Sequence, residues 1–290
     1  MNEIRRVAAV AATLSTAVLV AGSMPAWGQD EEKTLGWSKN AELSLVATSG
    51  NAESETFSLK ASFVRTMERS TLALSAAGLR AESTTTSRVA IGPPPFTVRE
   101  TSVTVPTAEN YALRGRYDHL VSETFFWHAG LTWERNEFAG FTKRLTGIGG
   151  VGNLWWDREG SRFRTDYSLT WTSQDDLVAN AALADGFLGV RFSYDYWRRL
   201  TATTELSSIL IADQRLDASA DWRADFTNSL SISISDRLAL KVGLQALYDN
   251  LPALGLAPIV DATGAPTGGT VPFELEKLDT IFTTALVVDF

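Results

Sequence analysis

The chain has 290 residues, no cysteine, and 26 Lys and Arg against 34 Asp and Glu, which gives a net charge of −8. The lack of cysteine excludes disulfides, thiolate metal sites and a lipid-anchored lipoprotein. The negative charge argues against a nucleic-acid binder, which needs a basic face. The mean hydropathy is −0.03. No stretch beyond the N-terminal segment reaches ~18 apolar residues, so a helical membrane protein is not expected.

The first 28 residues have the three parts of a secretory signal peptide. Two arginines precede the apolar residues 7–20, and the small residues Ala26 and Gly28 are placed for cleavage before residue 29. The apolar run is too short to span a membrane comfortably, which argues against an anchor helix. We therefore expect export and three segments: a signal peptide over 1–28, a polar lead-in over 29–36 and a barrel over 37–290.

From Trp37 onward the dominant period is two residues, which places apolar and polar side chains on opposite faces of a strand. The segment 222–235 shows this pattern clearly. One parity holds Trp222, Ala224, Phe226, Leu230, Ile232 and Ile234, interrupted only by Asn228, while the other holds charged and hydroxyl residues. A helix would mix these two sets, so the segment is expected to be a strand.

Turn residues divide the chain into twelve expected strands. They lie near residues 37–48, 53–65, 70–83, 109–121, 125–138, 145–157, 161–173, 185–196, 200–212, 218–234, 237–250 and 276–290. Twelve is an even number, as bacterial membrane barrels require, and strands of ~13 residues tilted by ~40–45° cross an apolar band of ~25 Å. The pattern predicts an all-β fold, a single antiparallel transmembrane barrel with both termini in the periplasm.

The connections alternate in length along the chain. Tight turns are expected at 67–69, 122–124, 158–160, 197–199 and 235–236, and longer loops at 50–52, 84–108, 139–144, 174–184, 213–217 and 251–275. Short periplasmic turns with longer extracellular loops are typical of bacterial barrels. The two longest loops contain Pro93–Pro95, Pro106, Pro252, Pro258, Pro266 and Pro272, and because proline is disfavoured within sheets we expect no strands there.

A soluble sandwich or lipocalin-like barrel is the main structural alternative. Twelve strands would leave its lumen too wide for apolar side chains to fill, and the opposite parity here is charged and small. Aromatic residues also gather near the strand ends, as at membrane interfaces. Those expected at the periplasmic rim are Trp37, Phe63, Phe125, Trp127, Trp155, Trp156, Phe163, Tyr194, Tyr196, Trp197 and Phe290; those at the other rim are Phe57, Tyr111, Phe138, Trp171, Phe187, Trp222 and Tyr248.

The last expected strand repeats the membrane-barrel signal. Alternate apolar residues lead up to a terminal aromatic residue, at Phe282, Leu286, Val288 and Phe290. This segment resembles the C-terminal recognition strand that the barrel-assembly machinery reads. Partners expected on this basis are outer-membrane lipid, lipopolysaccharide, the assembly machinery and periplasmic chaperones, with no nucleic acid.

Several short segments are similar to one bacterial family. They are residues 46–51 (VATSGN), 116–118 (RYD), 134–138 (ERNEF) and the glycines Gly147, Gly149, Gly150 and Gly152. The chain resembles the YdiY-like family of salt-induced outer-membrane proteins, a domain of unknown function, over essentially all of residues 37–290. The resemblance implies an outer-membrane barrel and a link to salt or osmotic stress, and it supplies no catalytic residues. By parity, Gly147 and Gly149 are expected to face the lumen and Gly150 and Gly152 the lipid.

Few residues suit catalysis or metal binding. The only histidines are His119, expected on the lipid face, and His128, expected in the lumen, so a zinc site is not expected. A phospholipase-like enzyme would need a serine and a histidine together on the lipid-facing outer rim. His119 instead falls at the periplasmic end and its near neighbour Ser122 lies in a turn. The sequence predicts neither an enzyme nor a cofactor.

The remaining candidate site is the lumen. Inward parity collects Glu42, Lys60, Arg114, Arg116, Asp118, Glu134, Arg162, Arg164, Asp166, Arg191, Asp195, Glu205, Arg223, Asp225, Lys241, Asp249 and Asp279. These charges either flank a water-filled path for small polar solutes or ions, or pair across the lumen and close it. A passive channel is the first hypothesis, a non-conducting structural or stress-related barrel the second, and surface binding through the long loops the third.

Overall fold

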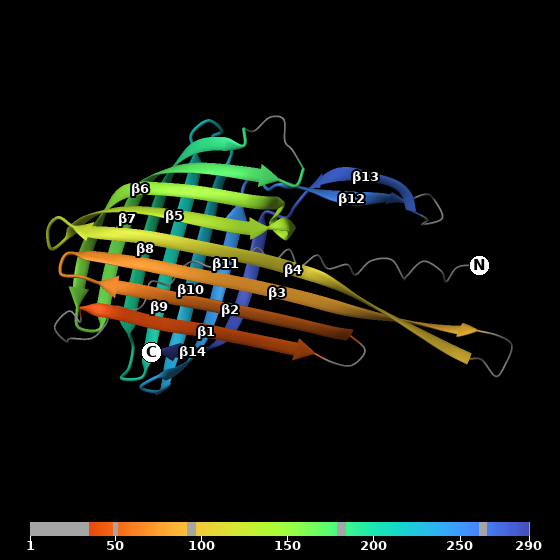
Figure 1. The fold of residues 1–290 in the computed structure, drawn as a ribbon, viewed down its shortest axis with the longest axis horizontal. Coiled ribbons are helices and arrows are strands. Elements are labelled where there is room, and N and C mark those ends of the chain that lie inside the picture. The colour runs from red at the N-terminus through yellow and green to blue at the C-terminus, as the bar shows by residue number, and fades with distance from the viewer. Residues whose placement is uncertain (1–34, 49–51, 92–96, 179–183, 261–265, 290) are drawn as a thin grey trace.

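A computed structural model describes all residues except 1–34, 49–51, 92–96, 179–183, 261–265 and 290 (Figure 1). Twelve antiparallel strands form one closed barrel, which confirms the predicted fold class. They are β1 (Gly36–Thr48), β2 (Ala52–Thr66), β3 (Ser70–Ile91), β4 (Thr97–Leu120), β5 (Phe125–Asn136), β6 (Phe141–Arg158), β7 (Ser161–Asp176), β8 (Gly186–Arg199), β9 (Thr204–Arg215), β10 (Trp222–Ser235), β11 (Leu238–Asp249) and β14 (Leu278–Asp289). Within the described residues, no helix has the length and apolar character to cross a membrane.

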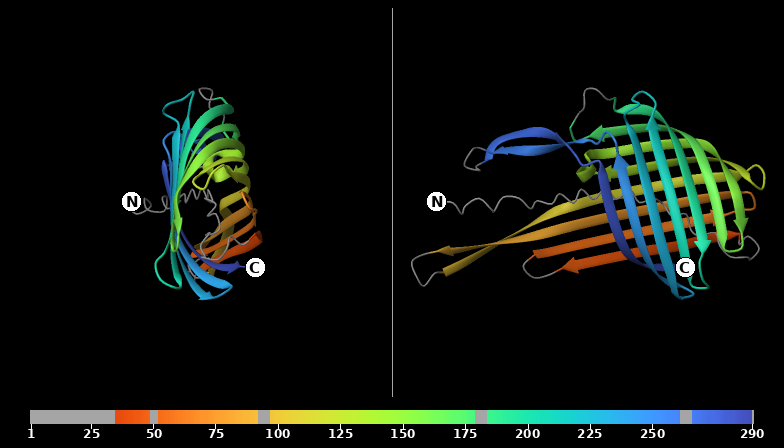
Figure 2. Two further views of the ribbon diagram at one scale, coloured as in Figure 1. Left: turned by 90° about the vertical axis from the view of Figure 1, so that its left-hand side faces the viewer. Right: turned by 180° about the vertical axis from the view of Figure 1, so that it is seen from behind.

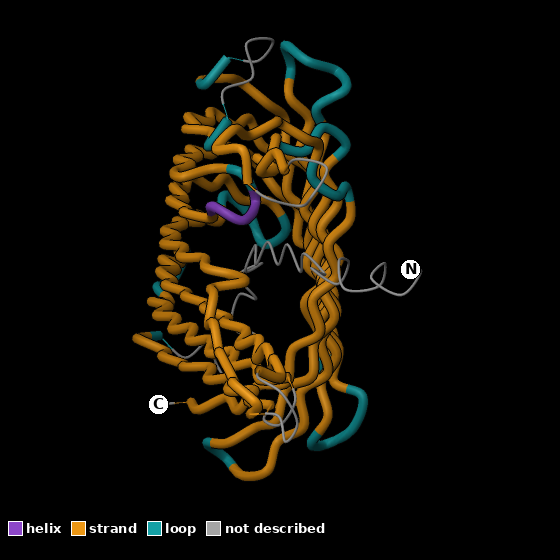
Figure 3. Tube along the Cα trace, turned by 90° about the vertical axis from the view of Figure 1, so that its right-hand side faces the viewer, coloured by secondary structure: helices purple, strands orange, loops and turns teal. Residues whose placement is uncertain are grey.

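The strands follow one another around the barrel in chain order, and β14 closes it by pairing with β1. The seam is short, from Asn40 opposite Asp289 to Leu43 opposite Leu286. The barrel is flattened in cross-section, so that two walls face each other (Figures 2 and 3). We call the end with the five short connections the turn end and the opposite one the loop end. The turn between β8 and β9 lies at 200–203 rather than at 197–199, because β8 continues to Arg199.

The outer face is apolar and the inner face is polar. Leu45, Leu169 and Phe282 point outward and are 71, 66 and 70% exposed, whereas Arg162 and Asp166 are buried inside. This arrangement is the reverse of that in a soluble barrel, which would hide its large apolar side chains. An exposed apolar band around a closed sheet suits lipid, because every strand has two hydrogen-bonded neighbours and no edge remains. The fold is therefore a transmembrane barrel.

The expectation that the two proline-rich loops contain no strands is wrong. β3 and β4 extend beyond the barrel as a two-stranded ribbon, and β12 (Leu254–Val260) pairs with β13 (Pro266–Glu274) in a second one (Figure 1). Pro106 lies beside a register shift at Ala81 and Glu82. In a ribbon of two strands each strand has a free edge, and a proline whose nitrogen points to that edge costs no ladder hydrogen bond.

The glycines of β6 face the opposite sides of the barrel wall from those predicted. Gly150 pairs with His128 and Gly152 pairs with Phe126, and both of those partners are buried inside the barrel. Gly149 is exposed on the outside. A run of glycines has no apolar side chain to mark its face, and the pairing of β6 is irregular at both ends of the strand. The sequence alone therefore does not show which glycines of β6 face the lumen and which face the lipid.

Three aromatic residues assigned to the girdles lie inside instead. Phe187 and Trp197 are 8 and 3% exposed and alternate with outward residues on β8, and Phe138 lines the lumen. Trp197 directly follows Tyr196, and neighbours on a strand point to opposite faces, so the two cannot both meet lipid. Among the residues that do stay exposed outside are Trp37, Trp127, Trp155, Trp171 and Trp222.

A short 3-10 turn, η1 (Glu137–Ala139), folds inward at the loop end (Figure 3). The side chain of Asn136 caps it by accepting a hydrogen bond from the Ala139 N–H at 3.0 Å. Gly140 ends it with φ +83°, a conformation that favours glycine. Ala139 packs against Leu247 and Ile281, on strands β11 and β14 of the opposite wall. The turn thus reaches across the mouth of the barrel and narrows it.

Some expectations fall outside the described residues. These are the signal peptide, residues 29–34 of the lead-in, residues 50 and 51 of the expected loop 50–52 and the terminal Phe290. The other residues of the predicted recognition signal lie in β14, where Phe282 and Leu286 are exposed on the outer face. β14 is also the strand that closes the barrel against β1.

Candidate functional site: the lumen

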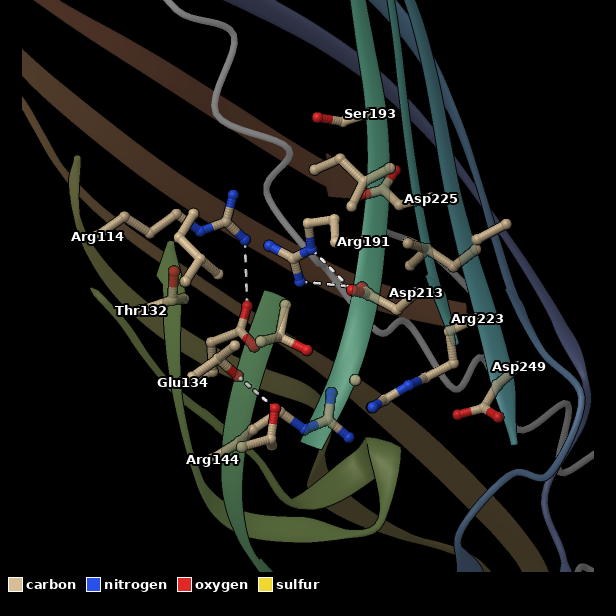
Figure 4. Close-up of a pocket in the computed structure, with 18 of the residues that line it drawn as sticks. Arg114, Thr132, Glu134, Arg144, Arg191, Ser193, Asp213, Arg223, Asp225 and Asp249 are labelled. Carbon is tan, nitrogen blue, oxygen red and sulfur yellow. Dashed lines mark hydrogen bonds and ion pairs between the residues drawn. The ribbon is translucent and has the colours of Figure 1, made fainter. Parts of the chain in front are cut away.

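A cavity of about 270 Å³ lies inside the barrel. At the loop end it is lined by η1 and by Pro252 and Leu275 at the base of the β12–β13 ribbon. Toward the turn end it reaches Arg164 and Asp166. Figure 4 shows that charged side chains from both walls point into it. Of the residues predicted from parity, the lining contains Arg114, Arg116, Glu134, Arg164, Asp166, Arg191, Asp195, Arg223, Asp225, Asp249 and Asp279.

Near the turn end, two arginines and two aspartates from β4 and β7 form a closed ring of ion pairs. Arg116 Nε lies 2.7 Å from Asp118 Oδ1, and Arg116 Nη1 lies 3.0 Å from Asp166 Oδ2. Arg164 contacts the same two carboxylates, at 3.3 Å from Asp118 and 3.1 Å from Asp166. Each charge thus has two opposite partners. Such a ring is rigid because no member can move without breaking two contacts.

The glycines of β6 make room for this ring. Strands β5 and β6 separate β4 from β7, so the ring must cross above them. A Cβ on Gly152 would lie within 2.7 Å of Asp166 Oδ1 and closer still to the ring of Phe126. Arg164 stacks over Phe126 at 4.6 Å. Phe126 therefore fills the floor beneath the ring, and only glycine fits at position 152.

His128 is the most deeply buried side chain beside this cluster. It is 1% exposed, and its Nε2 lies 2.9 Å from Ser168 Oγ. The predicted inward orientation agrees with this placement. No group of three or more His, Asp or Glu that could hold a metal ion occurs among the described residues. His128 packs beside Phe126 and forms a hydrogen bond with Ser168.

Three further ion pairs join neighbouring strands along the wall of the lumen. Arg114 Nη2 lies 3.1 Å from Glu134 Oε1, and Arg162 Nη2 lies 3.2 Å from Asp195 Oδ2. Arg191 binds Asp213 with two nitrogens, at 2.7 and 2.9 Å (Figure 4). A bidentate arginine–carboxylate pair is among the stronger hydrogen-bonded contacts available to side chains. Most of the predicted luminal charges are thus mutually paired.

A second, smaller cavity of about 120 Å³ lies against the seam. Glu42 sits between two lysines there, 3.6 Å from Lys60 Nζ and 3.1 Å from Lys241 Nζ. These three residues come from β1, β2 and β11, so the contact between Glu42 and Lys241 bridges the seam by linking β1 to β11 across β14. Parity predicted all three as luminal, but not that they form a cluster of their own.

Three other predicted carboxylates have local partners, namely Glu205, Asp225 and Asp249. Asp225 accepts two hydrogen bonds from Gln245 Nε2 at 2.9 Å, and the indole N–H of Trp197 donates to Glu205 at 3.2 Å. Asp249 accepts a hydrogen bond from the Leu251 N–H at 3.0 Å. Each of these carboxylates accepts a hydrogen bond from the protein, so it is less available to bind a solute in the lumen.

Sequence reasoning missed Arg144, Asp213 and Arg215, because it placed them in loops. β6 starts at Phe141 and β9 continues to Arg215, so all three lie on strands and line the cavity. Residues 213–215 (DQR) are all polar, so no alternation marks them as the end of a strand.

Arg215 fastens two loops at the rim. Its guanidinium contacts Asp217 Oδ1 at 2.5 Å, Asp221 Oδ2 at 3.6 Å and the Ala184 carbonyl oxygen at 3.1 Å. It also stacks over Phe187 at 4.1 Å. Because its nitrogens are occupied by these partners, Arg215 holds the loop before β8 against the loop after β9.

On the outer face near the turn end, His119 Nδ1 lies 2.8 Å from Ser70 Oγ. The Tyr117 hydroxyl donates to the same oxygen at 2.8 Å, and Trp127 packs beside the imidazole. Ser122, the neighbour considered from sequence, instead accepts hydrogen bonds from backbone N–H groups of its own turn. Among the described contacts of His119 there is no carboxylate. The pair of His119 and Ser70 therefore lacks the third group of a hydrolase triad.

The chain matches the family described as "Protein of unknown function, DUF481" over residues 41–290. It belongs to this family, in agreement with the barrel family of unknown function that the sequence resembles. No curated protein matches the chain by sequence.

Solved structures share the barrel at low identity. The NanC porin aligns over 87% of this chain and 98% of its own, with 7% identity and a TM-score of 0.45. An outer membrane channel from Pseudomonas putida F1 aligns over 91% and 98%, with 12% identity and a TM-score of 0.45. An anion-selective porin from Comamonas acidovorans aligns over 88% and 99%, with 7% identity and a TM-score of 0.38. These likenesses concern the fold alone and say nothing about a solute.

Proposed function

We propose that this protein is an outer-membrane barrel that acts as a passive channel for small polar solutes or ions. The observation that carries the proposal is the luminal cavity of about 270 Å³, which runs from the loop end to the ion-pair ring near the turn end. A charged, hydroxyl-lined cavity inside an apolar barrel holds water, because its walls offer hydrogen bonds in every direction.

The orientation proposed is that of bacterial barrels, with the turn end in the periplasm and the loop end outside. Lipopolysaccharide would then surround the outer rim, and the barrel-assembly machinery and periplasmic chaperones would act during biogenesis. Export through a cleaved signal peptide over residues 1–28 belongs to the same proposal. It is supported by the charged, apolar and small-residue segments in that order.

A second candidate function is a non-conducting structural barrel linked to salt or osmotic stress. The observation that favours it is η1, which reaches from one wall to Leu247 and Ile281 on the other. Together with the ring of Arg116, Asp118, Arg164 and Asp166 it narrows the lumen at both ends. A deletion strain that is salt-sensitive but shows no transport defect would favour this function.

Single-channel recording distinguishes the two. The refolded protein without residues 1–28 is added to a planar bilayer in KCl, with refolding checked by heat-modifiable migration on a gel. Stepwise conductance is expected from a channel. A correctly folded protein that remains electrically silent across the voltage range would refute the channel and leave the structural barrel.

A further inference from the structure

Two arginines at the loop end of the lumen differ from the other luminal cations. Arg144 lies near the start of β6 and Arg223 near the start of β10, and both line the large cavity. Figure 4 shows their side chains pointing into the cavity and toward each other. The two positive charges lie close enough to interact electrostatically. Two cations placed together are unfavourable unless an anion joins them.

Neither arginine forms an ion pair with a carboxylate within the described part of the chain. Arg144 donates from Nε to the neutral amide oxygen of Gln174 at 2.6 Å, which leaves both of its terminal nitrogens without a protein partner there. Arg223 has a described contact only with the ring of Phe187, at 5.8 Å. Arg144 is nevertheless 91% buried, with a relative exposure of 9%.

The carboxylates beside these arginines are already engaged. Glu134 lies opposite Arg144 in the β5–β6 ladder but binds Arg114 at 3.1 Å. Asp213 lies opposite Arg223 in the β9–β10 ladder but binds Arg191 through two nitrogens. Asp249 accepts a hydrogen bond from the Leu251 N–H, and Asp176 accepts one from the side chain of Gln174. Each neighbouring carboxylate therefore has another partner.

The aromatic rings keep the guanidinium groups in place without neutralising them. Arg144 stacks over Phe141 at 3.8 Å, and Arg223 lies over Phe187. A cation held over a ring keeps the N–H groups at its edge free to donate. The planar fork of arginine matches the two oxygens of a carboxylate. Threonine hydroxyls at Thr146 and Thr172 lie in the same lining and can bind neighbouring hydroxyl groups.

From this geometry we infer that Arg144 and Arg223 form a binding site for a small, hydroxylated carboxylate in the outer part of the lumen. The inference deepens the proposed channel function by naming its solute class. A singly charged carboxylate fits better than a dianion, because Glu134, Asp213 and Asp249 surround the pair and repel additional negative charge.

Isothermal titration calorimetry on the detergent-refolded barrel tests the site. Gluconate is the probe, and glucose, which has similar hydroxyl groups but no carboxylate, is the control ligand. Wild-type protein is expected to bind gluconate and not glucose. Arg144→Gln with Arg223→Gln should weaken gluconate binding by about tenfold or more, because charge-assisted hydrogen bonds are lost. The control is Arg80→Gln with Arg135→Gln. It removes two positive charges from exposed positions at the same end of the barrel and should change nothing.

Unchanged gluconate affinity in the Arg144 and Arg223 variant, or no gluconate binding by the wild type, overturns the inference. If the glutamine variant does not refold, Arg144→Lys with Arg223→Lys replaces it. That variant keeps the charge but not the fork, and an affinity equal to the wild type would again overturn the site.

Bilayer recording separates this inference from the channel proposal. A silent barrel that still binds gluconate through the two arginines refutes the channel and supports the site. A conducting barrel whose current and reversal potential are the same with gluconate and with glucose present, and which binds neither in the calorimeter, supports the channel and refutes the site.

Discussion

The two ends of the lumen use the same residue types in different ways. Near the turn end, Arg116 and Arg164 each face two aspartates, and the four charges close into a ring. Near the loop end, Arg144 and Arg223 stand beside carboxylates that bind other groups. An arginine inside a barrel has a structural role when it is paired with neighbouring carboxylates, and it is a candidate solute ligand when those carboxylates bind other groups. The face of the strand on which the arginine lies does not distinguish these two cases.

The largest effect is expected from breaking the ring at the turn end. Asp166→Ala removes one partner from both Arg116 and Arg164, whose charges are mostly buried. Removing one member of a buried ion pair costs about 3–5 kcal/mol, because the remaining charge is left without compensation. Urea unfolding of the barrel in lipid vesicles, followed by tryptophan fluorescence, measures this loss.

The loop end supplies the comparison for that experiment. Arg223→Gln removes a charge that has no carboxylate partner among the described residues, so the free energy of unfolding should change by no more than about 0.5 kcal/mol. Equal losses for Asp166→Ala and Arg223→Gln would show that the distinction between the two ends is wrong.

A loss smaller than that of Asp166→Ala, but larger than that of Arg223→Gln, is expected where the wall meets the ring. Gly152→Ala would bring a Cβ to 2.7 Å from Asp166 Oδ1 and into the ring of Phe126. Overpacking of this kind costs about 1–3 kcal/mol. Gly149→Ala is the matched control, because the outward Gly149 has no atom within 4 Å of the added Cβ. The same unfolding assay measures both, and an equal response would contradict the inward placement of Gly152.

The sequence predicted the barrel well because the relevant signal is repeated in every strand. Alternation along β10, for example, separates Trp222 and Phe226 from Asp225 and Ser229 without reference to any other strand. It failed on Gly150 and Gly152, where no side chain marks the face, and on the prolines of the two ribbons, whose free edges are a tertiary property. Arg144 was missed because it was placed in a loop. No pattern in the sequence near Glu134 shows that its carboxylate binds Arg114. The ion pairing that distinguishes the two ends of the lumen could therefore not be predicted from the sequence.

The smallest effect concerns the ion pair at the rim between buried Arg215 and exposed Asp217, which tests how much the burial of the carboxylate matters. In the loop between β9 and β10, Asp217 accepts hydrogen bonds from Arg215, which hold the pKa of Asp217 below its usual 3.8. Because the pKa is lowered on folding, the pair contributes fully above the unfolded-state pKa, and the contribution is lost as the pH falls through the folded one. Water screens this carboxylate, so stability should hardly respond, unlike the ring. An NMR titration of Asp217 should show the lowered pKa, and Arg215→Gln should return it to about 3.8. A pKa that is the same in both proteins would mean that the contact does not persist in solution.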